Sequence, residues 1–253
     1  MDHNNNYDWA QKSVFVENQT GVVAKKFFAN VFLWMFVALG LSTAAAIFMS
    51  NSPEIFQQLV KVNEAGRQSL SVLGWIVTLA PLGLVLLMSA GLSKLSYSAL
   101  VGVFVLYSVL TGISLSFIIS AYTSASVISC FAGATGIFGI MAVLGYTTNV
   151  DLSKFGSILM VGLVGLIIAS VVNAFIQSES FNLFLAFLGI AIFTALTAYD
   201  VQKLKRIGAG LEESGASIQD ADTKKLAIMG ALSLYLDFLN IFIFLLRIFG
   251  DRR

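Results

Sequence analysis

The stretch Met229–Gly250, MGALSLYLDFLNIFIFLLRIFG, decides the fold class of this 253-residue chain. Its only charged residues are Asp237 and Arg247, and the rest is almost entirely apolar. A helix needs about 20 apolar residues to cross the hydrocarbon core of a bilayer. The stretch therefore predicts a membrane-spanning helix that carries a carboxyl group near its middle.

The remainder of the chain repeats this apolar pattern. Hydrophobic residues make up 57% of the sequence and charged residues 11%, against roughly 25% charged in an average soluble domain. Lipid tolerates such a surface, provided that each span satisfies its backbone hydrogen bonds internally. We expect an all-α integral membrane protein, with a polar tail at residues 1–26 and a seven-transmembrane-helix bundle at 27–253. The expected spans lie near 27–49, 70–92, 96–120, 124–146, 155–176, 181–200 and 226–249.

Composition excludes several classes of protein. The net charge of +1 gives no basic field for nucleic acid. With one histidine, His3, and one cysteine, Cys130, the chain lacks the residues for a Ser-His-Asp triad, an HExxH zinc site or an intrachain disulfide. The first apolar run is longer than the apolar core of about 7–15 residues in a cleaved signal. We therefore expect a retained first span.

Basic residues orient the bundle, because cytoplasmic loops of membrane proteins are enriched in lysine and arginine. A cytoplasmic amino terminus places ten basic residues inside and five outside, which favours that orientation. The side of the carboxyl end stays open, because a last helix that does not fully cross would return its arginines to the cytoplasm. The ten are Lys12, Lys25, Lys26, Lys94, Lys154, Lys203, Lys205, Arg206, Lys224 and Lys225; the five are Lys61, Arg67, Arg247, Arg252 and Arg253.

Two acids stand apart from those in the tail and loops. Asp200 ends the sixth expected span and Asp237 lies within the seventh. A carboxylate at a helix centre costs roughly 2.5–3.5 kcal/mol, so it needs a partner, water or a proton. Helical spacing places each acid on a polar stripe. These stripes are Thr194, Thr197, Asp200 and Lys203 in the sixth span, and Gly230, Ser233, Asp237, Asn240 and Phe244 in the seventh.

The connection between these two spans makes them antiparallel, which allows the two carboxyl groups to meet. Two carboxyls withdrawn from water can share one proton and titrate as a unit. We hypothesise a pH-dependent latch at Asp200 and Asp237 on a cation path, with transient Ca²⁺ binding there. Thr197, Ser233 and Asn240 are candidate pore-lining or ion-coordinating residues, since Ca²⁺ prefers oxygen ligands. In the alternative, either acid simply hydrogen-bonds a neighbouring helix.

The segments AYDVQKLKRI (198–207) and ALSLYLDFLNIFIFLLRIFG (231–250) resemble the Bax inhibitor-1 family, which includes bacterial relatives of eukaryotic cell-death suppressors. The resemblance implies a bundle with the last helix central and a pH-sensitive calcium leak in a bacterial plasma (inner) membrane. It assigns Asp200 and Asp237 as the pH-sensing pair, and it implies no tightly bound cofactor. Some relatives stabilise the pair with charged residues in the second helix; here that helix has none, and Lys94 is the nearest base.

Other functions compete with a leak. A presenilin-type aspartyl protease requires Gly-x-Gly before its second aspartate, whereas Leu234, Tyr235 and Leu236 precede Asp237. A retinal protein requires a lysine within the last helix, which is absent here. We expect no enzyme. A proton-coupled carrier and a non-transporting protein that binds a regulatory membrane or cytoplasmic partner remain alternatives.

Overall fold

The computed structural model describes residues 21–62 and 68–252, and within them seven helices are long and apolar enough to cross a membrane. This confirms the expected seven-helix class. The spanning helices are α2 (Val22–Ser50), α4 (Val72–Gly91), α5 (Tyr97–Ile119), α6 (Ser124–Thr147), α7 (Gly156–Ile176), α8 (Glu179–Glu213) and α9 (Ala221–Phe249). A single 3₁₀ turn, η1 (Leu152–Phe155), leads into α7.

Hydroxyl side chains begin four of these helices. Ser71, Ser96, Thr123 and Ser178 each accept a hydrogen bond from the backbone N–H three residues later. Such a cap satisfies one of the N–H groups that the first turn of a helix leaves without a partner, and is worth about 1 kcal/mol. Local sequence therefore sets where α4, α5, α6 and α8 begin.

Two regions add detail to the expected spans. The connection from residue 50 to 69 contains α3 (Pro53–Leu59) and an antiparallel hairpin of β1 (Val60–Val62) and β2 (Gln68–Leu70). Helix α8 continues more than three turns beyond Asp200, where the sixth expected span ends. It continues because its extension buries residues against neighbouring segments.

The extension of α8 also fixes the start of α2. The carboxylate of Glu212 accepts hydrogen bonds from the backbone N–H groups of Gly21, at 2.6 Å, and Ala24, at 2.9 Å. Gly21 has a φ of 91°, in the left-handed region that glycine adopts without strain. Helix α2 begins at Val22, five residues before its expected start, and residues 1–20 of the polar tail lie outside the described residues.

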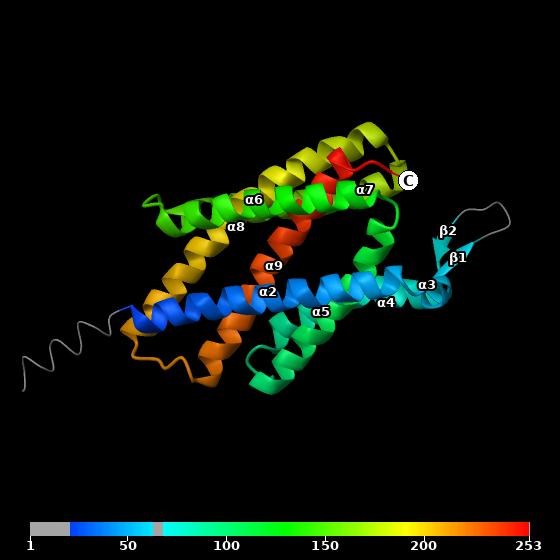
Figure 1. The fold of residues 1–253 in the computed structure, drawn as a ribbon. Coiled ribbons are helices and arrows are strands. Elements are labelled where there is room, and N and C mark those ends of the chain that lie inside the picture. The colour runs from blue at the N-terminus through cyan, green and yellow to red at the C-terminus, as the bar shows by residue number, and fades with distance from the viewer. Residues whose placement is uncertain (1–20, 63–67, 253) are drawn as a thin grey trace, which may run out of the picture.

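Helix α9 is central in the bundle, as expected. In its most apolar 18-residue window 72% of the residues are buried, compared with 44% in α8 and 6% in α7. It packs against α8, α2, α6 and α5, and Figure 1 shows it crossing α2 steeply. The side chains of α9 therefore face protein on most sides, which makes an acid in this helix harder to hydrate than one elsewhere.

The start of α2 and the segment after α9 lie at opposite ends of the bundle (Figure 1). Helix α9 is continuous, and the strand-like segment after it is held at the start of α6. There the N–H of Thr123 donates to the carbonyl of Asp251 at 3.0 Å, and Tyr122 forms a β-bridge with Arg252. The last helix therefore runs from one end of the bundle to the other.

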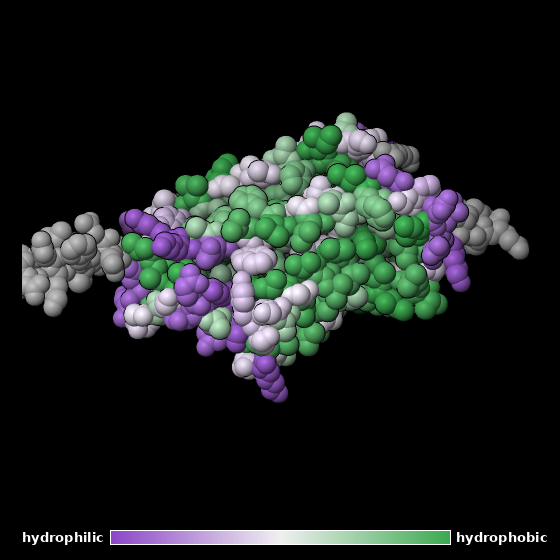
Figure 2. All heavy atoms as spheres, turned by 60° about the horizontal axis from the view of Figure 1, so that its bottom comes forward, coloured by the Kyte–Doolittle hydropathy of each residue, from purple (hydrophilic) through white to green (hydrophobic). Residues whose placement is uncertain are grey.

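The surface matches a protein embedded in lipid. Figure 2 shows a broad hydrophobic belt across the middle of the molecule, with hydrophilic residues gathered at its two ends. Large apolar side chains such as Val161, Phe175 and Phe184 are exposed on this belt. A soluble domain rarely exposes so large an apolar area. Together with the seven helices, the belt identifies an integral membrane protein.

Candidate functional site

The candidate site lies where α8 and α9 pack together. Asp200 and Asp237 are the only acids of the seven spanning helices that lie away from the helix ends. Helices α2 and α6, which pack on both α8 and α9, have no acid, and their basic residues are confined to Lys25 and Lys26 at the start of α2. Within the membrane part of the bundle, negative charge can therefore develop only at this pair.

The structure places the two carboxyl groups on facing helices, within electrostatic range of each other. The Asp237 side chain is 4% exposed, whereas Asp200 is partly exposed and also interacts with Lys203, one turn further along α8. The pair thus has one deeply buried member and one member nearer to water.

Asp237 lacks a partner for one of its oxygens. Its Oδ2 atom is buried and makes no hydrogen bond to any described residue. Buried polar atoms nearly always have a partner in native structures, and a buried carboxylate needs more of them than a neutral carboxylic acid does. This oxygen is suited to a proton, a water molecule or a cation.

The neighbouring polar side chains form hydrogen bonds mainly within their own helices. Thr197 is fully buried and its hydroxyl donates to the carbonyl of Phe193 at 2.8 Å, while the Asn240 amide donates to the carbonyl of Leu236 at 2.8 Å. Ser233 is half-buried on the same face of α9. The side-chain carbonyl oxygen of Asn240 and the hydroxyl oxygens of Thr197 and Ser233 can still accept a hydrogen bond or contact a cation.

The pair does not depend on a charge in α4. Helix α4 packs against α5 and α3, at the periphery of the bundle. Lys94, in the turn after α4, is exposed and forms no ion pair with a described residue. An interfacial anchor explains Lys94 better than a role in holding Asp200 and Asp237.

Sequence reasoning missed Gln202, two residues after Asp200. This side chain is 6% exposed, and its amide joins α8 to the connection between α6 and α7. Its Oε1 accepts from the N–H of Leu152 at 2.8 Å, and its Nε2 donates to the carbonyl of Val150 at 2.8 Å. The position of Asp200 is therefore coupled to that loop. In the sequence, the only sign of this role is the position of Gln202, an amide side chain next to Val201 in the polar stretch of α8.

A second missed group joins α9 to α2 and α5. The Tyr235 hydroxyl lies 2.6 Å from the hydroxyl of Ser42, which lies 2.7 Å from the carbonyl of Ser108. Because the carbonyl can only accept, Ser42 can donate to it while Tyr235 donates to Ser42. Tyr235 is two residues before Asp237, so this chain of hydrogen bonds fixes the helix that carries the buried acid.

The arrangement can bind and release a proton, and it can attract a cation. Two carboxyls share a proton readily when only one can be ionised at low energetic cost. If both are ionised, they repel each other across the α8–α9 contact and attract positive charge. No group of three or more metal-ligating side chains occurs in residues 21–62 and 68–252. Two carboxylates supply only part of the six to eight oxygens that Ca²⁺ takes, about 2.3–2.6 Å away.

Comparison with known proteins gives the family. The family model "Inhibitor of apoptosis-promoting Bax1" matches residues 24–253. The inner membrane protein YbhL of Escherichia coli is 41% identical over 227 residues, which cover 90% of this chain and 92% of that protein. An uncharacterized protein of Borreliella burgdorferi is 40% identical over 94% of this chain and 97% of its own length. Because both kinds of match cover nearly the whole sequence, the protein belongs to the Bax inhibitor-1 family of membrane proteins.

Proposed function

We propose that this protein is a pH-gated cation leak, with Ca²⁺ as the permeant ion and the Asp200–Asp237 pair as its gate. The observation that carries the proposal is the buried Oδ2 of Asp237, which lacks a partner among the described residues and belongs to a carboxyl within electrostatic range of a second acid. An ionisable group inside a membrane span most often marks an ion or proton pathway.

In the proposed closed state, one proton bridges the two carboxyls and holds α8 against α9. Loss of that proton as the pH rises leaves two negative charges, which repel each other and favour separation of the helices. Water and a cation can then enter between them. The oxygens of Thr197, Ser233 and Asn240 would contact the ion on its way, so that no single site holds it tightly.

The proposed setting is a bacterial inner membrane with a cytoplasmic amino terminus. The name of the E. coli relative supports the membrane, and the excess of basic residues at the end where α2 begins supports the orientation. In this orientation the end of the bundle that carries Lys203 and Gln202 faces the cytoplasm. Asp200 would then sense cytoplasmic pH.

Calcium uptake into liposomes across pH tests the proposal. We expect wild-type flux to rise with pH and Asp237→Asn to flatten this response, because an amide cannot gain or lose the shared proton. Asp200→Asn should also flatten it. Asp151→Asn, which changes an acid of the α6–α7 connection, is the matched control and should behave as wild type.

Other outcomes of the calcium-flux experiment would reject or change the proposal. A pH response unchanged by Asp237→Asn, in protein that is correctly inserted, would reject the gate. A response that depends on Asp237 alone would replace the pair by a lone proton site. Flux that saturates with calcium concentration would favour a proton-coupled carrier, and flux absent from every variant would favour a partner-binding protein.

A further inference from the structure

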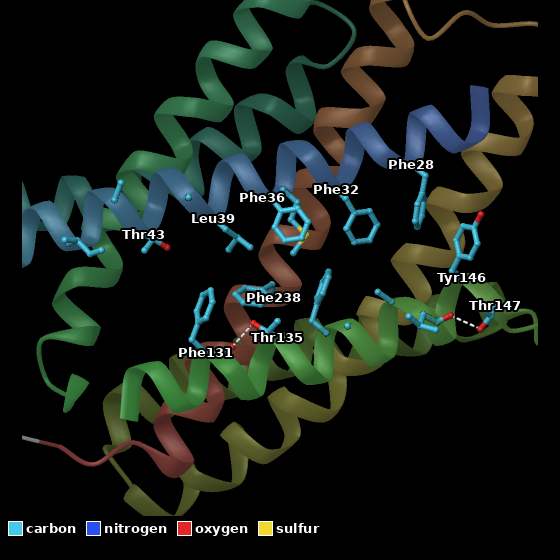
Figure 3. A pocket seen from close by; sticks show the side chains of 18 residues that line it. Phe28, Phe32, Phe36, Leu39, Thr43, Phe131, Thr135, Tyr146, Thr147 and Phe238 are labelled. Carbon is cyan, nitrogen blue, oxygen red and sulfur yellow. Dashed lines mark hydrogen bonds between the residues drawn. The ribbon is translucent and has the colours of Figure 1, made fainter. Parts of the chain in front are cut away.

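A long cavity lies between α2 and α6, and neither aspartate of the pair lines it. Its volume is about 950 Å³, within the roughly 300–1,000 Å³ typical of ligand sites. Figure 3 shows α2 and α6 as its two walls, with Phe32 and Phe36 on one side, Phe131 on the other, and Phe238 of α9 between them. Almost all of its lining is apolar.

The shape of the cavity is elongated. Along α2 its lining extends from Phe28 to Ile47, about five helical turns. A second hollow of about 450 Å³ continues it, because both are lined by Leu39, Thr43 and Phe131. A narrow apolar groove of this length fits a hydrocarbon chain better than a compact ligand.

The groove opens toward lipid. On its walls Phe36 is 64% exposed and Val143 is 63% exposed, so the lining is accessible from the hydrophobic belt. The groove is also not filled by the protein itself. Added Cβ atoms at Gly40 and Gly139, which line opposite walls, would meet no atom within 4 Å.

One end of the groove is basic. There the Lys205 ammonium donates to the carbonyl of Tyr146 at 2.8 Å and lies 4.9 Å from the centre of its ring. Tyr146 itself lines the groove. Lys25 is exposed on α2, seven and eleven residues before Phe32 and Phe36, which places it on the same helix face.

Two acids at this end are engaged by groups other than those two lysines. Arg206 binds the carboxylate of Asp151, and the backbone of Gly21 and Ala24 occupies the carboxylate of Glu212. Neither Lys25 nor Lys205 forms an ion pair with a described residue. The groove thus combines an apolar channel with two lysines at one end that form no ion pair with a described residue, a distribution complementary to an anionic phospholipid.

We propose that this groove binds an anionic phospholipid from the surrounding bilayer. One acyl chain lies between α2 and α6, and the phosphate lies at Lys25 and Lys205. The bound chain fills the space between two helices that both pack on α9. This proposal does not depend on calcium conduction.

Native mass spectrometry of the full-length protein in detergent tests the proposal, with phosphatidylglycerol and phosphatidylcholine of equal chain length as probes. We expect one phosphatidylglycerol to be retained in preference to phosphatidylcholine. Gly139→Leu and Gly40→Leu should lose this adduct, because leucine fills the groove. Gly136→Leu is the matched control: it lies in α6, has equally open space at its Cβ position and does not line the groove. It should retain the lipid.

A second pair of variants tests the charged end. Lys25→Gln should abolish the preference for phosphatidylglycerol, while Lys26→Gln, on another face of the same helix, should not. Equal retention of both lipids by the wild type, or equal adducts in Gly139→Leu and Gly136→Leu, would overturn the proposal. So would a protein dimer that Gly139→Leu dissociates, since the groove would then be an interface between two copies.

Discussion

Two aspartates of the bundle, Asp151 and Asp237, show how surroundings decide what an acid can do. Asp151, in the α6–α7 connection, accepts hydrogen bonds from the N–H and hydroxyl of Ser153 and pairs with Arg206. Asp237 has an oxygen that no described residue supports. The surroundings of Asp151 stabilise a permanently ionised carboxylate. Those of Asp237 favour a carboxyl that changes its protonation or binds an ion.

The Asp151 carboxyl should take no part in a pH response near neutrality. Hydrogen bonds from Ser153 and Arg206 lower its pKa from 3.8 to about 2. A lowered pKa in the folded state stabilises the fold above the ordinary pKa, and that contribution disappears as the pH falls toward 2. Between about pH 6 and pH 8 the group stays ionised. Asp151→Asn should therefore leave the midpoint of the flux–pH curve in place; a shifted midpoint in the liposome assay would contradict this.

At the scale of helices, close backbone contacts rather than apolar burial position the candidate site. In α6, Gly145 faces α8 so closely that an added Cβ would lie 2.3 Å from the carbonyl oxygen of Ala198, two residues before Asp200. Gly112 of α5 meets Ser42 of α2 in the same way. Helices in lipid gain little from burying apolar surface, so small residues at crossings contribute much of the packing.

We expect Gly145→Ala to destabilise the protein by about 1–3 kcal/mol, because the methyl group forces α6 away from α8. Gly136→Ala in the same helix meets open space. It should be neutral or stabilising by up to about 1 kcal/mol, through helix propensity alone. Thermal unfolding in detergent measures both, and equal melting temperatures for the two variants would show that the α6–α8 crossing is not tightly packed.

At the scale of the molecule, the path of the chain fixes which loops share a side of the membrane. The amino-terminal end of α2, the α4–α5 turn, the α6–α7 connection and the α8–α9 loop lie at one end. The β1–β2 hairpin and the chain segment after α9 lie at the other. The basic residues follow this division, since most of them lie at the end where α2 begins.

Single cysteines should report this division in intact cells. In a Cys130→Ala background, which removes the only native thiol, Ser69→Cys in β2 should react with a membrane-impermeant maleimide. Gln219→Cys, in the α8–α9 loop, should react only after the membrane is opened. Both side chains are exposed in the folded protein. Labelling of both cysteines in intact cells would refute the topology, and the reverse pattern would invert the orientation.

The sequence predicted much of the architecture because lipid imposes simple rules. A span must be long and apolar, so the seven helices could be located from hydropathy and spacing. The isolated acids in the sixth and seventh spans stood out for the same reason. Helical periodicity also placed Asp237 on a polar stripe that turns inward.

Other features depended on contacts between distant segments. Local hydropathy could not show that Glu212 caps α2, or that Gln202 holds the α6–α7 loop, since each partner lies far away in the sequence. Nor could it show which glycines are contact points: Gly136 and Gly139 of α6 meet nothing within 4 Å, whereas Gly145 of the same helix meets α8.

The sequence by itself determined that seven helices cross a membrane and that two of them carry an acid, because lipid selects for length and apolarity within each segment. Only the tertiary structure decided that the acids lie within electrostatic range of each other, that one oxygen of Asp237 lies buried without a partner among the described residues, and that a groove separates α2 from α6. These properties depend on how helices pack against one another, and packing is set by side-chain shape across the bundle rather than by the pattern along any one helix.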